Sequence, residues 1–99
     1  MMTVVTHIKI AEGQEPTWDA AMRERITAAK AQPGFVSVQV GIPADALDGR
    51  VVIGTWQSRA DWEAWHDTDS FRSTRERMDR CEVERQGEWW HEVVLAEQR

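Results

Sequence analysis

Several segments of this 99-residue chain are apolar at consecutive positions rather than at alternate ones. The clearest are Val51-Val52-Ile53, Trp89-Trp90 and Val93-Val94-Leu95, in stretches whose composition favours β-strands. A sheet with one wet face alternates apolar and polar side chains, so this pattern predicts a sheet that is covered on both faces. The helices of so short a chain can cover only one face. We therefore expect a homodimer, in which a second copy covers the other.

Four strands are predicted from short β-branched and aromatic runs that are bounded by turn-forming or charged residues. They span Val4–Ile10, Phe35–Val40, Arg50–Trp56 and Glu88–Leu95. The pair Asp48-Gly49 is a hairpin-turn signal between the second and third runs. We expect these two strands to pair antiparallel.

Apolar residues at helical spacing predict the helices between the strands. The first helix has a buried stripe made of Trp18, Met22, Ile26 and Ala29. Pro16 suits its first turn, and Gln32-Pro33-Gly34 ends its pattern. Ser58 followed by Asp61 resembles a capping box that begins a second helix, and a third helical stretch covers about Ser70–Arg80.

The resulting order is β, α, β, β, α, β, with the last helix in two pieces. It predicts an α+β, ferredoxin-like domain over residues 1–99, with a four-stranded antiparallel sheet and helices on one face. No stretch rich in serine, glycine and proline divides the chain, so a single domain is expected.

Charge and cysteine content exclude several classes of partner. The chain has 12 Lys and Arg against 17 Asp and Glu, for a net charge of -5, and the basic residues alternate with acidic ones. This balance argues against nucleic acid or an anionic membrane as partner. Cys81 is the only cysteine, and no signal-like segment or long apolar run is present. We expect a cytoplasmic protein without a disulfide or a membrane span, and Cys81 is interpreted as a bystander.

Four features occur in a set order over nearly the whole chain. They are Pro33-Gly34-Phe35 entering the second strand, Thr55-Trp56-Gln57-Ser58 leaving the third, Trp65 on the next helix, and Phe71 soon after. Their order and spacing resemble the antibiotic biosynthesis monooxygenase family and its haem-degrading relatives. The resemblance implies a dimeric α+β barrel with one pocket per subunit between sheet and helices. It also implies oxidation of a small planar phenolic or polyketide-like compound without metal or flavin.

The haem-degrading branch carries an Asn on its first strand, a Trp on the middle helix and an iron-binding His on the next helix. On this sequence the Trp position is Trp65, but the Asn position is Thr6 and the His position is Thr74. A threonine hydroxyl does not replace imidazole as an iron ligand, so the resemblance implies no haem cofactor of the usual kind. The alternatives are a non-catalytic or haem-binding protein of this fold, or an isomerase or cyclase.

Cofactor-free oxygenation needs a base, donors for the substrate anion and a pocket that excludes water. His66 is the expected base because it follows Trp65 on the helix that would roof the pocket. The expected catalytic residues are Trp65, His66 and Thr6, and the expected substrate contacts are Trp62, Phe71, Thr74 and Ile8. Strand alternation would turn His7 toward the dimer side. A surface or core position is the alternative for each histidine.

The remaining tryptophans, Trp18, Trp56, Trp89 and Trp90, are predicted to fill the core. No metal site is predicted, because the three histidines, His7, His66 and His91, lack ligand spacing. The sequence also has no glycine-rich loop for a nucleotide phosphate.

Overall fold

The computed structural model describes residues 1–99 and contains four strands and three helices. In chain order the elements are β1 (Met2–Ile10), α1 (Glu15–Ala29), β2 (Phe35–Gly41), β3 (Gly49–Trp56), α2 (Arg59–His66), α3 (Asp69–Asp79) and β4 (Glu82–Glu92). Neighbouring strands all pair antiparallel in the order β2-β3-β1-β4. The predicted ferredoxin-like α+β fold is confirmed, with its second helical segment divided into α2 and α3.

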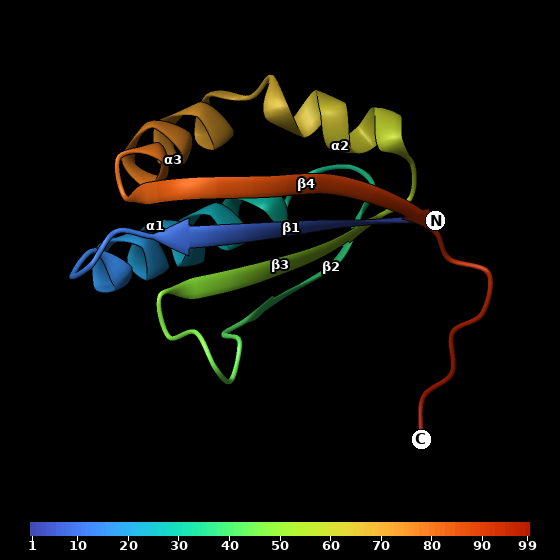
Figure 1. Cartoon of the computed structure of the whole chain (residues 1–99). Coiled ribbons are helices and arrows are strands. Elements are labelled where there is room, and N and C mark those ends of the chain that lie inside the picture. Colours follow the sequence, from blue (N-terminus) through green and yellow to red (C-terminus); the bar gives the residue numbers. More distant parts are fainter.

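All three helices lie on one side of the sheet (Figure 1). Helix α1 packs against α3, and α2 and α3 run along the edge that β4 forms. The other face of the sheet has no helix over it. No helix has both the length and the apolar character that crossing a lipid bilayer requires.

Strand β1 shows how the sequence divides the two faces. Its alternate residues Val4, Thr6, Ile8 and Ile10 are buried under the helices. His7 and Lys9 are exposed on the opposite face, as the period of two requires. The predicted orientation of His7, away from the helices, is therefore confirmed.

The buried side chains form two groups between sheet and helices. One consists of Ile8, Ile10, Trp18, Ala21, Met22, Met78 and Cys81, and the other of Ala29, Trp56, Trp65 and Phe71. In the first group Trp18 is fully buried, and its Nε1–H donates to Glu82 at 2.9 Å. This bond satisfies the indole donor and ties α1 to the start of β4.

Two side-chain caps begin the short helices. The Ser58 hydroxyl accepts from the Asp61 backbone N–H at 3.1 Å and donates to the Asp61 carboxylate at 2.9 Å, so Ser58 caps α2 as predicted, without the reciprocal bond of a full capping box. Thr68 caps α3 in the same way by accepting from the Phe71 N–H at 3.3 Å. Gly34 has a φ of 83°, and a Cβ there would overlap the Asp61 side chain, so this turn requires glycine.

The predicted antiparallel pairing of β2 and β3 is confirmed, but the Asp48-Gly49 pair does not form a tight hairpin turn of its own. Gly49 already belongs to β3 and has no positive φ, and residues 42–48 form a longer loop. Arg50 holds this loop closed, because its buried guanidinium donates to the Leu47 and Gly49 carbonyls and to both carboxylate oxygens of Asp19. Sequence spacing gave no sign of this ion pair, in which Arg50 is buried and Asp19 is half-exposed.

The predicted bounds of the last strand are also wrong. Strand β4 spans Glu82–Glu92, whereas Val94 and Leu95 are exposed beyond its end. The cause is the length of the partner strand: β1 begins at Met2, which pairs with Glu92, so no backbone remains to pair with the residues that follow Val93. The apolar run Val93-Val94-Leu95 therefore adds nothing to the sheet.

Candidate active site

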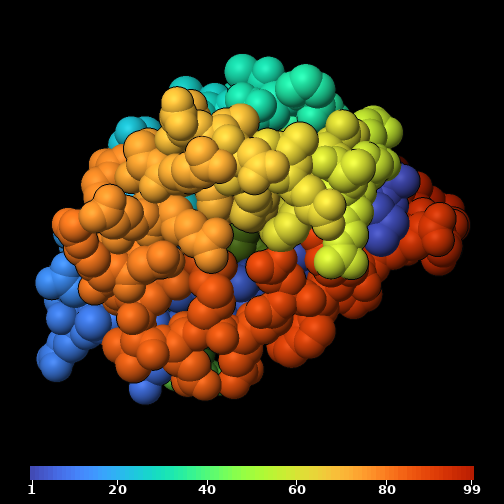
Figure 2. Space-filling model, turned by 90° about the horizontal axis from the view of Figure 1, so that it is seen from above, coloured from blue at the N-terminus to red at the C-terminus, as the bar shows by residue number.

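A cavity of about 100 Å3 lies between the sheet and the helices, where the two groups of buried side chains meet. All four strands supply one side of it, and α1, α2 and α3 supply the other. Seen from above, the surface is hollowed between α2 and α3 and strand β4, and deeper green and blue atoms are visible there (Figure 2). Most of its lining is apolar, as in ligand sites that exclude water.

Six of the seven predicted site residues line this cavity, from three different elements. They are Thr6, Ile8, Trp62, Trp65, His66 and Phe71. Thr74 is the exception, because it is buried behind the lining and does not contact the cavity. Its hydroxyl donates to the Phe71 carbonyl and accepts from Arg25 Nε, each at 2.9 Å, so it is not free to bind a substrate.

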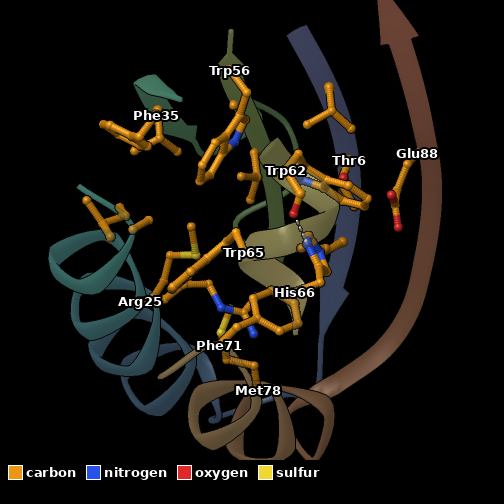
Figure 3. Close-up of a pocket in the computed structure, with 18 of the residues that line it drawn as sticks. Thr6, Arg25, Phe35, Trp56, Trp62, Trp65, His66, Phe71, Met78 and Glu88 are labelled. Carbon is orange, nitrogen blue, oxygen red and sulfur yellow. Dashed lines mark hydrogen bonds between the residues drawn. The ribbon is translucent and has the colours of Figure 1, made fainter. Parts of the chain in front are cut away.

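Aromatic rings form one continuous wall of the cavity (Figure 3). His66 lies between Trp62 and Phe71, with ring centroids 3.7 and 4.0 Å away. Trp65 stacks on Trp56 at 6.4 Å and meets the edge of Phe71 at 5.5 Å. Trp56, which the sequence assigned to the core, is buried and also lines the cavity. The wall suits a flat ligand.

One hydrogen bond defines the protonation of His66. Its Nδ1 lies 2.8 Å from the Trp62 carbonyl oxygen (Figure 3). A carbonyl can only accept, so Nδ1 carries a proton, and in the neutral ring Nε2 then keeps its lone pair. Burial lowers the pKa of His66 below its ordinary value, and the cations Arg25, Arg75 and Arg85 lower it further. The bond to Trp62 opposes this shift. His66 is therefore a neutral imidazole at pH 7, with its basic nitrogen free.

Comparison with known proteins assigns the family. The sequence profile of the antibiotic biosynthesis monooxygenases matches residues 1–77. The chain belongs to this family. No curated protein matches the chain, so the profile and the solved structures carry the comparison.

Solved structures of the antibiotic biosynthesis monooxygenase fold are closely similar. One, a protein of Nitrosomonas europaea classed in this group, has a TM-score of 0.88 at 17% identity and covers 96% of this chain and 100% of its own. A second, from Chloroflexus aurantiacus, has a TM-score of 0.86 at 15% identity, covering 98% and 96%. SnoaB, a cofactor-independent oxygenase from Streptomyces nogalater, has a TM-score of 0.82 at 14% identity, covering 96% and 94%. Because these sequence identities are low, the structural similarity establishes the fold alone.

The residues at the expected haem positions do not fit a haem iron. Thr74 stands where the haem-degrading branch has its histidine, and both functions of its hydroxyl are already used by Arg25 and Phe71. A neutral hydroxyl held in this way does not replace the imidazole nitrogen that ligates haem iron. No group of three or more His, Cys, Asp or Glu side chains is arranged to hold another metal ion.

Three charged residues that were not predicted from the sequence also line the cavity. They are Arg25 from α1, and Arg85 and Glu88 from β4. Arg25 could have been found, because it lies three residues after Met22 and four before Ala29, on the apolar side of its helix. Arg85 lies in the part of β4 that was not predicted to be a strand. Because the strand was predicted to begin only at Glu88, the face of the sheet on which Arg85 lies could not be predicted.

The other reactive side chains lie away from the cavity. His7 is exposed on the open face, where its ring is 5.2 Å from Trp89, and His91 is exposed on the same face at the register position of Thr3. Cys81 is buried, and burial raises the pKa of its thiol. A thiol that stays protonated is a poor nucleophile, as a bystander would be.

Acid should destabilise the fold through His66. Its pKa is lowered in the folded protein, so below about pH 6.5 the unfolded chain binds a proton that the folded chain does not. Stability from this group is present above that pH and is lost as pH falls toward the folded pKa. We expect the free energy of unfolding in urea to fall between about pH 7.5 and 5.5 more steeply in the wild type than in His66→Gln. Equal slopes would show that His66 is not buried as a neutral group.

Proposed function

We propose that this protein is a cofactor-independent monooxygenase that oxidises a small planar phenolic or polyketide-like molecule. The observation that carries the proposal is the free Nε2 of neutral His66 in a cavity walled by aromatic rings. The family assignment and the similarity to SnoaB, a cofactor-independent oxygenase, support the same chemistry.

The proposed reaction begins with proton removal. His66 Nε2 takes an acidic C–H or phenol proton, which leaves an electron-rich anion in a site with little water. The anion gives electrons to O2, and a C–O bond forms to give a peroxide. Protonated His66 returns its proton, and the peroxide loses water to leave a carbonyl. A CH2 group and O2 thus become C=O and H2O, with O2 as the oxidant.

Two neutral donors are available to hold the substrate anion. The Trp65 indole N–H and the Thr6 hydroxyl line the cavity, and neither makes a hydrogen bond to another protein group. Both are held on regular elements, α2 and β1, which keeps their direction fixed. Donors aimed at developing charge lower the barrier to proton removal.

Oxygen uptake tests this proposal directly. The purified protein is mixed with a panel of anthrones and dihydroxynaphthalenes in buffer treated with chelator, and O2 consumption and quinone absorbance are followed together. We expect stoichiometric quinone formation above the uncatalysed rate, unchanged by chelator. Folded protein that consumes no O2 across the panel would contradict oxygenation. Exchange of substrate C–H for deuterium without O2 uptake would indicate an isomerase or cyclase instead.

We also propose that the protein works as a homodimer in the cytoplasm. The open face of the sheet carries Val5, Val51, Ile53 and Trp89 without cover from this chain. Trp89, which the sequence placed in the core, is 48% exposed there. An apolar surface of this kind on a small domain is typical of an interface, and a second sheet would cover it.

A charge on the open face tests the dimer. Ile53 lies on the central strand β3 opposite Val5, so we expect Ile53→Glu to convert a dimer into a monomer in sedimentation velocity at micromolar concentration. The control is Ala20→Glu, which adds the same charge at an exposed site on α1. A wild-type protein that sediments as a monomer under these conditions would overturn the dimer.

A further inference from the structure

Arg25 brings a positive charge to the cavity without an acidic partner. Its Nε donates to Thr74 Oγ1 at 2.9 Å, but it takes part in no ion pair within 4.0 Å. Neither terminal nitrogen makes a hydrogen bond, and one of them, Nη2, is buried. Leaving a buried cationic nitrogen without an acceptor is destabilising, so Nη2 would be stabilised by an acceptor that the chain itself does not supply.

The two carboxylates that raise the pKa of Arg25, those of Glu82 and Asp79, are already paired with other arginines. Glu82 binds both Arg85 Nε and Nη2 at 3.0 Å, and it accepts from Trp18. Asp79 pairs with Arg75 at 3.7 Å on the surface of α3. Burial, followed by repulsion from Arg85, lowers the pKa of Arg25 to about 10, which still leaves it charged at neutral pH. Arg25 is therefore the cavity's unneutralised cation.

Arg25 and the proposed base, His66, contact the same aromatic ring. The Arg25 guanidinium carbon lies 4.3 Å from the centre of the Phe71 ring, and the His66 ring lies 4.0 Å from the same centre. In Figure 3 Arg25 reaches in from α1 and Glu88 lies at the opposite side, beyond His66. An oxygen bound by Arg25 would thus lie beside Phe71, the ring that His66 also contacts.

We propose that Arg25 docks an anionic oxygen group of the ligand, either a carboxylate or a phenolate. The planar guanidinium suits such oxygens because its N–H groups form a fork, and two of its nitrogens are unused. The site then selects flat aromatic anions over neutral molecules of equal shape. This inference rests on the proposed function, because it names the substrate class for the same cavity.

Isothermal titration without O2 tests the selection. Two anions are each paired with a neutral analogue: 2-naphthoate with 2-naphthamide, and 2,4-dinitro-1-naphtholate with its methyl ether. We expect the wild type to bind at least one anion about 10- to 100-fold more tightly than its neutral analogue. A preference in only one pair shows which oxygen group, the carboxylate or the phenolate, Arg25 binds.

Substitutions of Arg25 give the decisive comparison. Arg25→Met keeps the unbranched apolar stem of the side chain and removes the guanidinium with its charge, so the anion preference should vanish while binding of the neutral analogue stays within about twofold. Arg25→Lys, which keeps the charge but loses the fork, should retain part of the preference. Arg23→Met removes a charge at an exposed site of the same helix and should change nothing.

Three results would overturn the inference: binding of neither anion, equal binding of anion and analogue by the wild type, or an unchanged preference in Arg25→Met. If Arg25→Met fails to fold, Arg25→Lys decides the question: a reduced anion preference supports the role of Arg25, and an unchanged preference contradicts it. Because no turnover is measured, a protein that binds anions through Arg25 but consumes no O2 would contradict only the proposed oxygenation. O2 uptake without any anion preference would contradict only the role of Arg25.

Discussion

The His66→Gln variant should oxidise its substrate at least about 100-fold more slowly than the wild type, because it lacks the general base. Glutamine keeps a donor for the Trp62 carbonyl, which now binds His66 Nδ1 at 2.8 Å, and has nearly the same volume. The variant therefore removes the basic nitrogen and little else. The measurement is kcat from O2 uptake with the best substrate of the panel, at a pH where the wild type is fully active.

The matched control for this variant is His91→Gln. His91 lies near the end of β4 on the side of the sheet opposite the cavity, so its replacement should leave kcat within about twofold. Both variants should show the circular dichroism spectrum of the wild type. A fully active His66→Gln variant would show that another group removes the proton.

The Trp18→Ala variant should lose about 3 to 5 kcal/mol of its free energy of unfolding, the largest effect on stability that we expect from one substitution. Trp18 is fully buried among the side chains that join α1 to the sheet, and a much smaller residue leaves a cavity there. Loss of its bond to Glu82 adds to the cost. The loss is a large fraction of the stability of a domain this size, and urea unfolding at pH 7 measures it.

Trp18→Phe separates the two contributions. Phenylalanine fills most of the space but has no N–H for Glu82, so its cost should be clearly smaller than that of alanine. A smaller loss in Trp18→Ala than in Trp18→Phe, or a loss below about 1 kcal/mol in both, would contradict the place of Trp18 in the core.

Local patterns were sufficient to predict most of the fold. The stripe of α1, the alternation of β1 and the cap at Ser58 each follow from short-range geometry, and the structure confirms them. The ends of β4 could not be predicted in this way. They depend on where its partner β1 begins, which is a long-range property, and the apolar run after Glu92 was misleading.

The candidate site was predictable where neighbours on one helix or strand determined it. Trp62, Trp65 and His66 share α2, so their common wall follows from helical spacing once the helix is placed over the sheet. Arg25 was missed because an arginine within an apolar stripe is usually expected to extend into solvent. The family resemblance matched Thr74 to a ligand position. In the structure its hydroxyl accepts a hydrogen bond from Arg25 Nε and helps to hold the Arg25 side chain in place.

The state of His66 is the claim on which the proposed chemistry depends. Nitrogen-15 NMR of the histidine side chains measures it directly, because protonated and bare ring nitrogens have very different shifts. At pH 7 we expect His66 to be neutral, with its proton on Nδ1 and a bare Nε2. A charged imidazolium at that pH, or a proton on Nε2 with Nδ1 bare, would contradict this account.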